Sequence, residues 1–280
     1  MPLHGSDVPP PDQAKPDPAD PGKPSPGLPR PGLPRPRAMR ADRAAGVGPP
    51  GSRRLTLSVV IAADGDTGRL AACLAALRSA PARGIDLEVL VVTAGASAAG
   101  ARAIDAACSA AGARVLTVDG TRGARFAAGA RAATGEWLLL LRPESVLEPG
   151  WDATLMVFAH EDRNRERGAV YTYRAEGDGP AARRAERAAR LRNRWIGLPS
   201  GAQGLVIRRR FLVHLGGVPD LERGEDLVLG RALGLGRLAM FDVGVRVRPA
   251  TGARAWTSGA VRLLLFMLRL PPRWLQSMGD

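Results

Sequence analysis

The acidic side chains best placed to do chemistry are Glu144 and the neighbouring pair Glu225 and Asp226. Glu144 follows the apolar run WLLLL by three residues, and a carboxylate there is a hard oxygen ligand of the kind that Mg²⁺ or Mn²⁺ needs against a diphosphate. Glu225 and Asp226 come at an expected helix start, where one carboxylate can act as a general base. Simpler explanations stay open, because an acid beside a proline is typical of a turn and acids favour the positive end of a helix.

Other polar turns follow the earlier apolar runs of the chain. Asp64 and Asp66 lie in the segment AADGDTG after LTLSVVIA, and Gly123 follows a later run. The turn has no GxGxxG pattern, which argues against a dinucleotide-binding Rossmann domain. A P-loop is excluded because no GxxxxGK[ST] segment exists and the two lysines, Lys15 and Lys23, lie near the N-terminus. The turns that follow the apolar runs are therefore acidic and rich in glycine.

The elements that must position these residues are short apolar runs that alternate with helical patterns. The expected strands cover residues 55–62, 86–93, 113–118 and 137–141, and the expected helices cover residues 68–79, 97–111 and 124–133. This alternation predicts βαβ units and an α/β fold, with a mostly parallel central sheet and helices on both faces. Ligands of such sheets bind at the carboxyl ends of the strands, so the turns after these strands are the candidate site.

The regular alternation stops after residue 141. Beyond it we expect helices at 150–159, 181–195 and 225–235, a strand at AVYTYR and short strands around 238–247. One domain with two halves explains this pattern better than two separate domains.

The first 52 residues differ from the rest in composition. Of the 24 prolines, 15 fall within residues 1–50, and the segment GLPRP occurs twice. Such a segment favours polyproline II and lacks a packed core, so we predict a disordered arm at 1–52 before a domain at 53–280. A solvated tail and a docking arm for a proline-binding module both stay open.

The formal net charge of +13 is unevenly distributed. Residues 1–54 carry +4, and residues 163–210 carry +9 from 13 arginines and 4 acids, which leaves the remainder neutral. This predicts a single basic face. Nucleic acid is not the expected partner, because few aromatic residues lie in this stretch and no known module is visible. The open alternatives are a diphosphate donor, an anionic acceptor and anionic lipid headgroups.

The C-terminal segment VRLLLFMLRLPPRWL predicts an apolar and basic helix from about residue 258. Its leucines either cover the core or, with Trp274 at an interfacial position, lie on an anionic membrane. No apolar run reaches the roughly 18 to 20 residues that span a bilayer, and the N-terminus has no secretory pattern. The expected location is cytoplasmic, with peripheral contact at the inner face of the membrane as a further expectation. Cys73 and Cys108 are too few for a disulfide framework and are expected as buried hydrophobic residues.

The chain resembles the family 2 inverting glycosyltransferases, which have the GT-A fold, in the order and spacing of six segments. These segments are LTLSVVIAADGDTGRLAACLAALRS, DLEVLVVTAGAS, GARVLTVDGTRGARFAAGARAATGEWLLLLRPESVLEPGW, GLPSGAQGLVIRRRFLVHLGGVPD, GEDLVLGRALGLGRLA and TGARAW. The resemblance is to a small bacterial branch with LHADT-like and GDQGLF-like motifs, and it covers about Leu55 to Trp274. It implies a nucleotide-diphospho-sugar transferase fold.

The resemblance also implies a reaction, in which a sugar moves from a nucleotide-sugar donor to a hydroxyl acceptor with inversion, assisted by Mg²⁺ or Mn²⁺. Glu144 stands where the family binds its metal, Asp226 stands at the base, and Glu225 supports it. The acceptor is unidentified, and a lipid-linked one fits the basic and apolar features. The implied donor-binding residues are Ala62, Asp64, Asp66, Thr93, Arg122, Gly123, Gln203, Arg254 and Trp256.

Several motif positions depart from the family pattern. The metal motif reads Arg142-Pro143-Glu144, which places an arginine two residues from the expected ligand, where it competes electrostatically for the same space. Thr93 stands where the family usually has an acid that contacts the base of the nucleotide. A catalytically silent relative that binds a ligand, a partner or a membrane is therefore the alternative function.

Overall fold

The structure of the chain is a computed structural model that describes residues 38–39, 54–63, 68–95, 98–196 and 199–248. The chain divides into two compact units, Met1–Leu33 and Pro34–Asp280, and every described residue belongs to the second. The expected arm, apart from residues 38–39, and the expected C-terminal helix lie outside the described residues. Within the described part, no helix combines the length and the apolar character that crossing a membrane requires.

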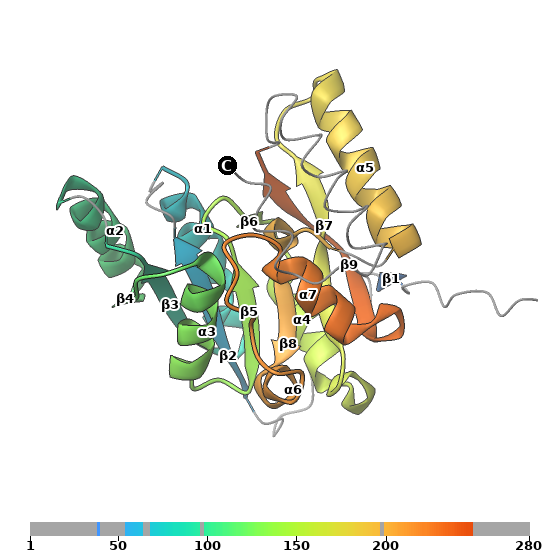
Figure 1. Cartoon of the computed structure of the whole chain (residues 1–280), viewed down its shortest axis with the longest axis horizontal. Helices are drawn as coiled ribbons and strands as arrows, with labels where there is room; N and C mark the ends of the chain where they lie inside the picture. The colour runs from blue at the N-terminus through green and yellow to red at the C-terminus, as the bar shows by residue number, and fades with distance from the viewer. Residues whose placement is uncertain (1–37, 40–53, 64–67, 96–97, 197–198, 249–280) are drawn as a thin grey trace, which may run out of the picture. The chain divides into compact units, whose positions relative to one another are not determined.

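The described strands form one nine-stranded sheet, in the order β1-β9-β7-β8-β5-β2-β3-β4, with β6 paired to β9 beside this path (Figure 1). Its strands are β1 (Ala38–Met39), β2 (Leu55–Ala63), β3 (Ile85–Thr93), β4 (Arg114–Thr117), β5 (Trp137–Leu141), β6 (Val146–Leu147), β7 (Gly168–Ala175), β8 (Leu205–Arg208) and β9 (Leu238–Val247). Strands β2 to β5 are mutually parallel, whereas β8 is antiparallel to both β5 and β7. The sheet is mostly parallel, as the sequence predicts.

Helices cover both faces of this sheet (Figure 1). One face packs against α1 (Leu70–Ala76), α2 (Ala98–Ala111) and α4 (Trp151–His160). The other face packs against α3 (Arg122–Ala132), α6 (Arg209–His214) and α7 (Glu225–Leu233). Helix α5 (Pro180–Ile196) packs against β7, and short 3-10 turns lie at Leu77–Ser79, Pro81–Arg83, Asp162–Asn164, Gly201–Gln203 and Leu235–Arg237.

Strand β2 is buried on both faces at the centre of the sheet. Leu57, Val59 and Ile61 belong to the core layer of α1, α2 and α4, whereas Val60 and Ala62 belong to the opposite layer. Successive side chains of a strand point to opposite faces, so a strand covered on both sides needs a nearly continuous apolar run. This is the physical reason why the run LTLSVVIA predicts the strand correctly.

The structure confirms most of the expected elements and changes some of their boundaries. β5 has the expected bounds, and residues 238–247 form one ten-residue strand instead of several short ones. The helix expected over 225–235 ends at Leu233, because Gly234 adopts a positive φ of 74°. Neither β8 nor α6 is predicted from the sequence, because both are short, with four and six residues.

Both cysteines lie in the core layer of α1 and α2, which confirms the expectation of buried hydrophobic residues. Burial raises the pKa of the Cys73 thiol to about 12 and that of Cys108 to about 11, and nearby carboxylates add to both shifts. Because the thiolate is the reactive form, both side chains are chemically inert near neutral pH.

A polar network fixes the amino-terminal edge of the sheet around Glu88 on β3. Its Oε2 accepts hydrogen bonds from the Ser58 hydroxyl of β2, from the Thr134 N–H at 2.9 Å and from the Thr134 hydroxyl at 3.0 Å. Arg114 on β4 lies 3.1 Å from Oε1. Burial alone would raise the pKa of Glu88, but these bonds and the Arg114 charge outweigh it and lower the pKa.

We predict that Glu88→Gln lowers the free energy of unfolding at pH 7 by about 1 to 3 kcal/mol, the range of hydrogen bonds to a charged group. A carboxyl with a lowered folded-state pKa stabilises the protein fully above its ordinary pKa, and this contribution is lost as the pH falls through the folded-state value. Urea unfolding between pH 7 and pH 3 measures both effects. If the difference in free energy of unfolding between the wild type and Glu88→Gln stayed constant over this pH range, Glu88 would not have the lowered pKa.

Candidate active site

Three segments that lie far apart in the sequence meet at the carboxyl edge of the sheet. Arg122 begins α3 after β4, Arg142 and Glu144 lie in the turn after β5, and Glu225 and Asp226 begin α7. The Arg142 guanidinium lies 3.9 Å from a Glu144 oxygen, 3.3 Å from a Glu225 oxygen and 3.6 Å from an Asp226 oxygen. The structure therefore brings together five of the residues that the sequence singles out.

Glu225 is the most buried acid of this group. Its side chain is only 3% exposed, and both of its oxygens accept hydrogen bonds from Arg122, at 2.8 Å from Nε and 3.0 Å from Nη2. A bidentate ion pair of this kind fixes both side chains and compensates the burial of the carboxylate. Glu225 is thus held by Arg122 at the start of α7, next to Asp226 in the sequence.

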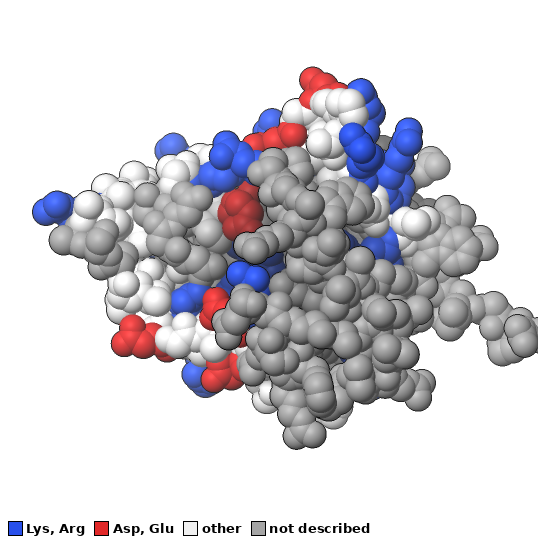
Figure 2. Space-filling model, turned by 45° about the horizontal axis from the view of Figure 1, so that its top comes forward, with Lys and Arg blue, Asp and Glu red and all other residues white. Residues whose placement is uncertain are grey.

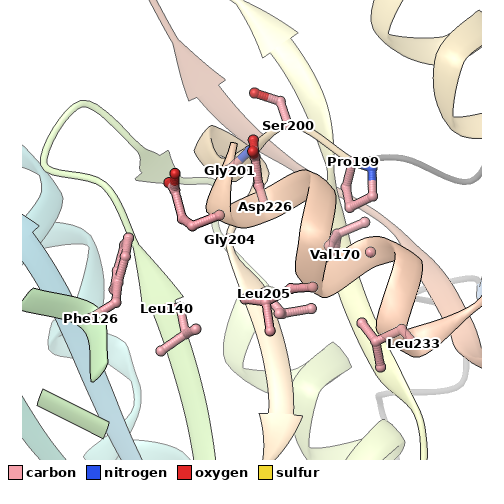
Figure 3. A pocket seen from close by; sticks show the side chains of 13 residues that line it. Phe126, Leu140, Val170, Pro199, Ser200, Gly201, Gly204, Leu205, Asp226 and Leu233 are labelled. Atoms are coloured by element: carbon pink, nitrogen blue, oxygen red, sulfur yellow. The ribbon is translucent and has the colours of Figure 1, made fainter. Parts of the chain in front are cut away.

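Asp226 faces outward at the start of α7, and its side chain is 20% exposed. Its Oδ1 accepts the Leu227 N–H at 2.9 Å, and its Oδ2 accepts the Gly201 N–H at 2.6 Å. Figure 3 shows Asp226 at the top of α7, next to Gly201 and Ser200. Each carboxylate oxygen has a second lone pair, so an oriented and accessible acceptor of a proton remains.

The turn after β5 places Arg142 and Glu144. The Ser145 N–H donates to the Arg142 carbonyl at 3.0 Å, and the Ser145 hydroxyl donates to the Ala202 carbonyl at 2.8 Å. Pro143 favours such a turn because its φ is already fixed. Glu144 is therefore a turn residue that lies beside the Arg142 guanidinium, and its expected role as a metal ligand stays a prediction.

Gln203 is an expected donor-binding residue whose amide is bonded within the protein. It is fully buried, its Nε2 donates to the Tyr171 carbonyl at 2.8 Å, and its Oε1 accepts the Ser200 N–H at 2.9 Å and the Asn193 amide at 3.2 Å. The amide therefore joins α5 and β7 to the 3-10 turn that carries Gly201. Its role in this structure is to position the loop that contacts Asp226.

The remaining expected donor-binding residues either have packing or hydrogen-bonding roles within the fold or lie outside the described residues. Ala62 is a fully buried core residue of β2, and the Thr93 hydroxyl donates to the Ala94 carbonyl at 2.8 Å. Position 123 requires glycine because the backbone packs closely there: a Cβ would lie 2.1 Å from the Pro219 carbonyl oxygen. Four other expected residues lie outside the described residues: Asp64, Asp66, Arg254 and Trp256.

A narrow apolar crevice of about 30 Å³ lies between α7 and β5, with Asp226 at its polar end (Figure 3). Phe126, Leu140 and Leu233 are among its apolar lining residues. Its volume admits little more than one water molecule, so it is too small for a nucleotide-sugar.

Helix α5 carries part of the basic stretch 163–210, and Figure 2 shows basic side chains gathered on it. Its exposed arginines are Arg183, Arg184, Arg187 and Arg190. On the inner side of the helix, burial lowers the pKa of the Arg192 guanidinium, and the attraction of Asp226 opposes this shift. α5 therefore carries positive charge both outward and toward the site.

The described residues do not fit the expected Mg²⁺ or Mn²⁺ ion. Among them, no group of three or more His, Cys, Asp or Glu side chains is arranged to hold a metal. Glu225 is engaged by Arg122, Asp226 accepts two backbone N–H groups, and Arg142 lies beside both acids and Glu144. A divalent cation beside these carboxylates would face the Arg142 charge.

Arg142 is the functional candidate that sequence reasoning underestimates. The sequence identifies it as an electrostatic competitor of a metal, but its position at the centre of three carboxylates depends on loops that no local pattern predicts. The one available signal is its place directly after WLLLL, at the carboxyl end of a buried parallel strand.

We predict that Gln203→Leu lowers the free energy of unfolding by about 2 to 4 kcal/mol, because it leaves buried partners without hydrogen bonds. Urea unfolding measures the change. Val213→Ala, at a side chain 71% exposed, serves as the control and should change stability by less than about 0.5 kcal/mol. Equal losses in the two variants would show that the buried amide has no such role.

No protein-family model matches the chain, and no curated protein sequence matches it. Solved structures do match it. The mannosyl-3-phosphoglycerate synthase of Rubrobacter xylanophilus is 19% identical, with 86% of this chain and 87% of that chain covered and a TM-score of 0.57. The glucosyl-3-phosphoglycerate synthase of Mycobacterium tuberculosis is 18% identical, with 78% and 82% covered and a TM-score of 0.56.

A second structure of the mycobacterial synthase, in complex with Mn²⁺ and uridine-diphosphate-glucose, is 16% identical, with 85% and 88% covered and a TM-score of 0.56. At such identities the likeness concerns the fold. The mostly parallel sheet of this chain and the helices on both of its faces match the architecture of these solved structures. The described domain has the GT-A fold of nucleotide-sugar glycosyltransferases.

Proposed function

We propose that the chain transfers a sugar from a nucleotide-sugar donor to a hydroxyl acceptor. The observation that carries the proposal is the oriented, partly exposed carboxylate of Asp226 at the carboxyl edge of the sheet, close to Arg142 and next to the Arg122–Glu225 ion pair. The edge combines a proton acceptor with guanidinium groups that suit a diphosphate. The names of the solved neighbours, which are sugar-transferring synthases, support the same reaction class.

In the proposed reaction the acceptor hydroxyl attacks the anomeric carbon from the face opposite the diphosphate. The new C–O bond forms as the bond to the diphosphate oxygen breaks, the hydroxyl proton passes to Asp226, and the nucleoside diphosphate leaves with the bonding electrons. The configuration at the anomeric carbon is inverted. Arg122 and Arg142 stabilise the negative charge on the leaving group.

The expectation of Mg²⁺ or Mn²⁺ at Glu144 has support in the Mn²⁺ complex of a solved neighbour. A divalent ion would supply positive charge to the leaving diphosphate. Because the described residues of this chain do not fit such an ion, no step above depends on it.

The acceptor is unidentified. The acceptor named in the solved neighbours, phosphoglycerate, is an anion, and the arginines of α5 favour an acceptor of that charge here. 3-Phosphoglycerate is therefore the first acceptor to test. The alternative is a chain that binds a nucleotide-sugar without transferring the sugar, and it is favoured by the ion pair that engages both oxygens of Glu225 and by the two backbone N–H groups that Asp226 already accepts.

We predict that Asp226→Asn lowers the rate of transfer at least about 100-fold, the lower range of general-base catalysis, while nucleotide-sugar binding stays within about threefold. Release of nucleoside diphosphate from UDP-, GDP- and ADP-sugars measures turnover, calorimetry measures binding, and NMR of the product shows the anomeric configuration. The control is Asp242→Asn, at an exposed acid of β9. Full transfer by Asp226→Asn would exclude Asp226 as the base, and binding without transfer by the wild type would favour the silent alternative.

We also propose that the exposed arginines of α5 contact anionic lipid headgroups, as the charge distribution of the sequence predicts. Each arginine near such a surface contributes about 1 kcal/mol. Replacing Arg183, Arg184, Arg187 and Arg190 by Gln should therefore weaken sedimentation with phosphatidylserine vesicles at least about 100-fold, without effect on neutral vesicles. Wild-type binding that is absent, or that does not fall with added salt, would contradict this contact.

A further inference from the structure

The position among the three site carboxylates is occupied by a side chain of the protein. The Arg142 guanidinium has Glu144 beside Nη1 and has Glu225 and Asp226 beside Nη2, at 3.9, 3.3 and 3.6 Å. Carboxylate oxygens are the ligands that a hard divalent cation prefers, but in the present arrangement no group of three or more acids among the described residues could hold a metal ion. The three carboxylates of the site surround a guanidinium instead.

The fold holds this guanidinium in place. The Arg142 side chain is 18% exposed, and its Nε is buried without a hydrogen-bond partner in the described part of the chain. The backbone of Gly201 lies against it, because a Cβ at Gly201 would come within 2.6 Å of Nη2 and 2.9 Å of Nε. A side chain at position 201 would push the guanidinium out of this position, and the same residue donates its N–H to Asp226.

The electrostatics oppose a second cation at this point. Arg122 already occupies both oxygens of Glu225, so the charge of that acid is compensated. A divalent ion at Glu144 or Asp226 would stand close to the Arg142 charge, and like charges repel more strongly in a partly buried site. An anion approaching from the open side meets guanidinium N–H groups, which bind phosphate oxygens in pairs.

We propose that Arg142 is a fixed cation that takes the place of the divalent metal, so that the chain binds the diphosphate of its donor without metal. This inference rests on the proposed function for the identity of the anion. It also makes a claim about this chain alone: the carboxylates of Glu144, Glu225 and Asp226 bind no divalent ion while Arg142 is present, and they bind one when it is removed.

The first experiment measures Mn²⁺ binding by the loss of the electron paramagnetic resonance signal of free Mn²⁺, without nucleotide. The wild type should leave this signal unchanged. Arg142→Ala and the larger Arg142→Gln should each raise the affinity for Mn²⁺ at least about tenfold, because a like charge is removed from a set of three carboxylates. Arg131→Ala, at an exposed residue of α3, is the control and should match the wild type. Circular dichroism and thermal unfolding show whether each variant is folded.

The second experiment titrates UDP, GDP and ADP into the wild type and both variants, in EDTA and in Mn²⁺. The wild-type affinity for the preferred nucleotide should be the same within about twofold in both solutions. In EDTA, Arg142→Ala should bind it at least about tenfold more weakly, and Mn²⁺ should restore part of the loss.

The outcomes separate this inference from the proposed function. Mn²⁺ binding by the wild type, Mn²⁺-dependent nucleotide binding by the wild type, or folded Arg142 variants without Mn²⁺ affinity would each overturn the fixed cation and leave the proposed function standing. A wild type that binds no nucleotide in either solution would overturn the proposed function. The Mn²⁺ measurement on the variants would still decide whether Arg142 occupies a cation position.

Discussion

Both oxygens of Glu225 bond to the guanidinium of Arg122, and the arrangement of the candidate site follows from this buried ion pair. Helix α3, which carries Arg122, packs on β2 and β3, whereas α7, which carries Glu225, lies against β7, where Leu233 is next to Gly168. The pair therefore joins the two halves of the domain at the carboxyl edge of the sheet. A carboxylate that is almost fully buried is strongly destabilising without such a partner. The ion pair therefore fixes the start of α3 relative to the start of α7.

A continuous series of contacts leads from this edge to helix α5. Asp226 accepts the N–H of Gly201, Gln203 lies in the same 3-10 turn as Gly201, and the Gln203 amide bonds to Asn193 on α5 and to the Tyr171 carbonyl on β7. The members of this series are almost all polar, and most of them are buried. Buried polar groups need specific hydrogen-bond partners. This requirement specifies one arrangement of the loop and helix start at this edge, whereas apolar packing alone would allow several arrangements.

The sequence predicts the sheet much better than it predicts the site. Strands such as LTLSVVIA and WLLLL are covered on both faces, so burial alone makes them apolar and recognisable. The acids of the site are also found, since they follow these strands or begin a helix. No local sequence pattern predicts which residue each acid contacts, because the partners come from distant segments of the chain. Gln203 lies in a segment expected at the donor pocket, but it is a buried amide, and Gly123 is a glycine because of the carbonyl of Pro219.

In the proposed transfer reaction, the close approach of Gly201 to Arg142 would have a consequence for product release. A guanidinium attached to the chain cannot be removed by a chelator, it does not exchange with other ions, and it carries one positive charge where a divalent metal carries two. Attraction to a leaving diphosphate is correspondingly weaker, so the product is held less firmly. Where release of the nucleoside diphosphate limits turnover, an enzyme of this construction gains speed at that step and has no need of a metal supply.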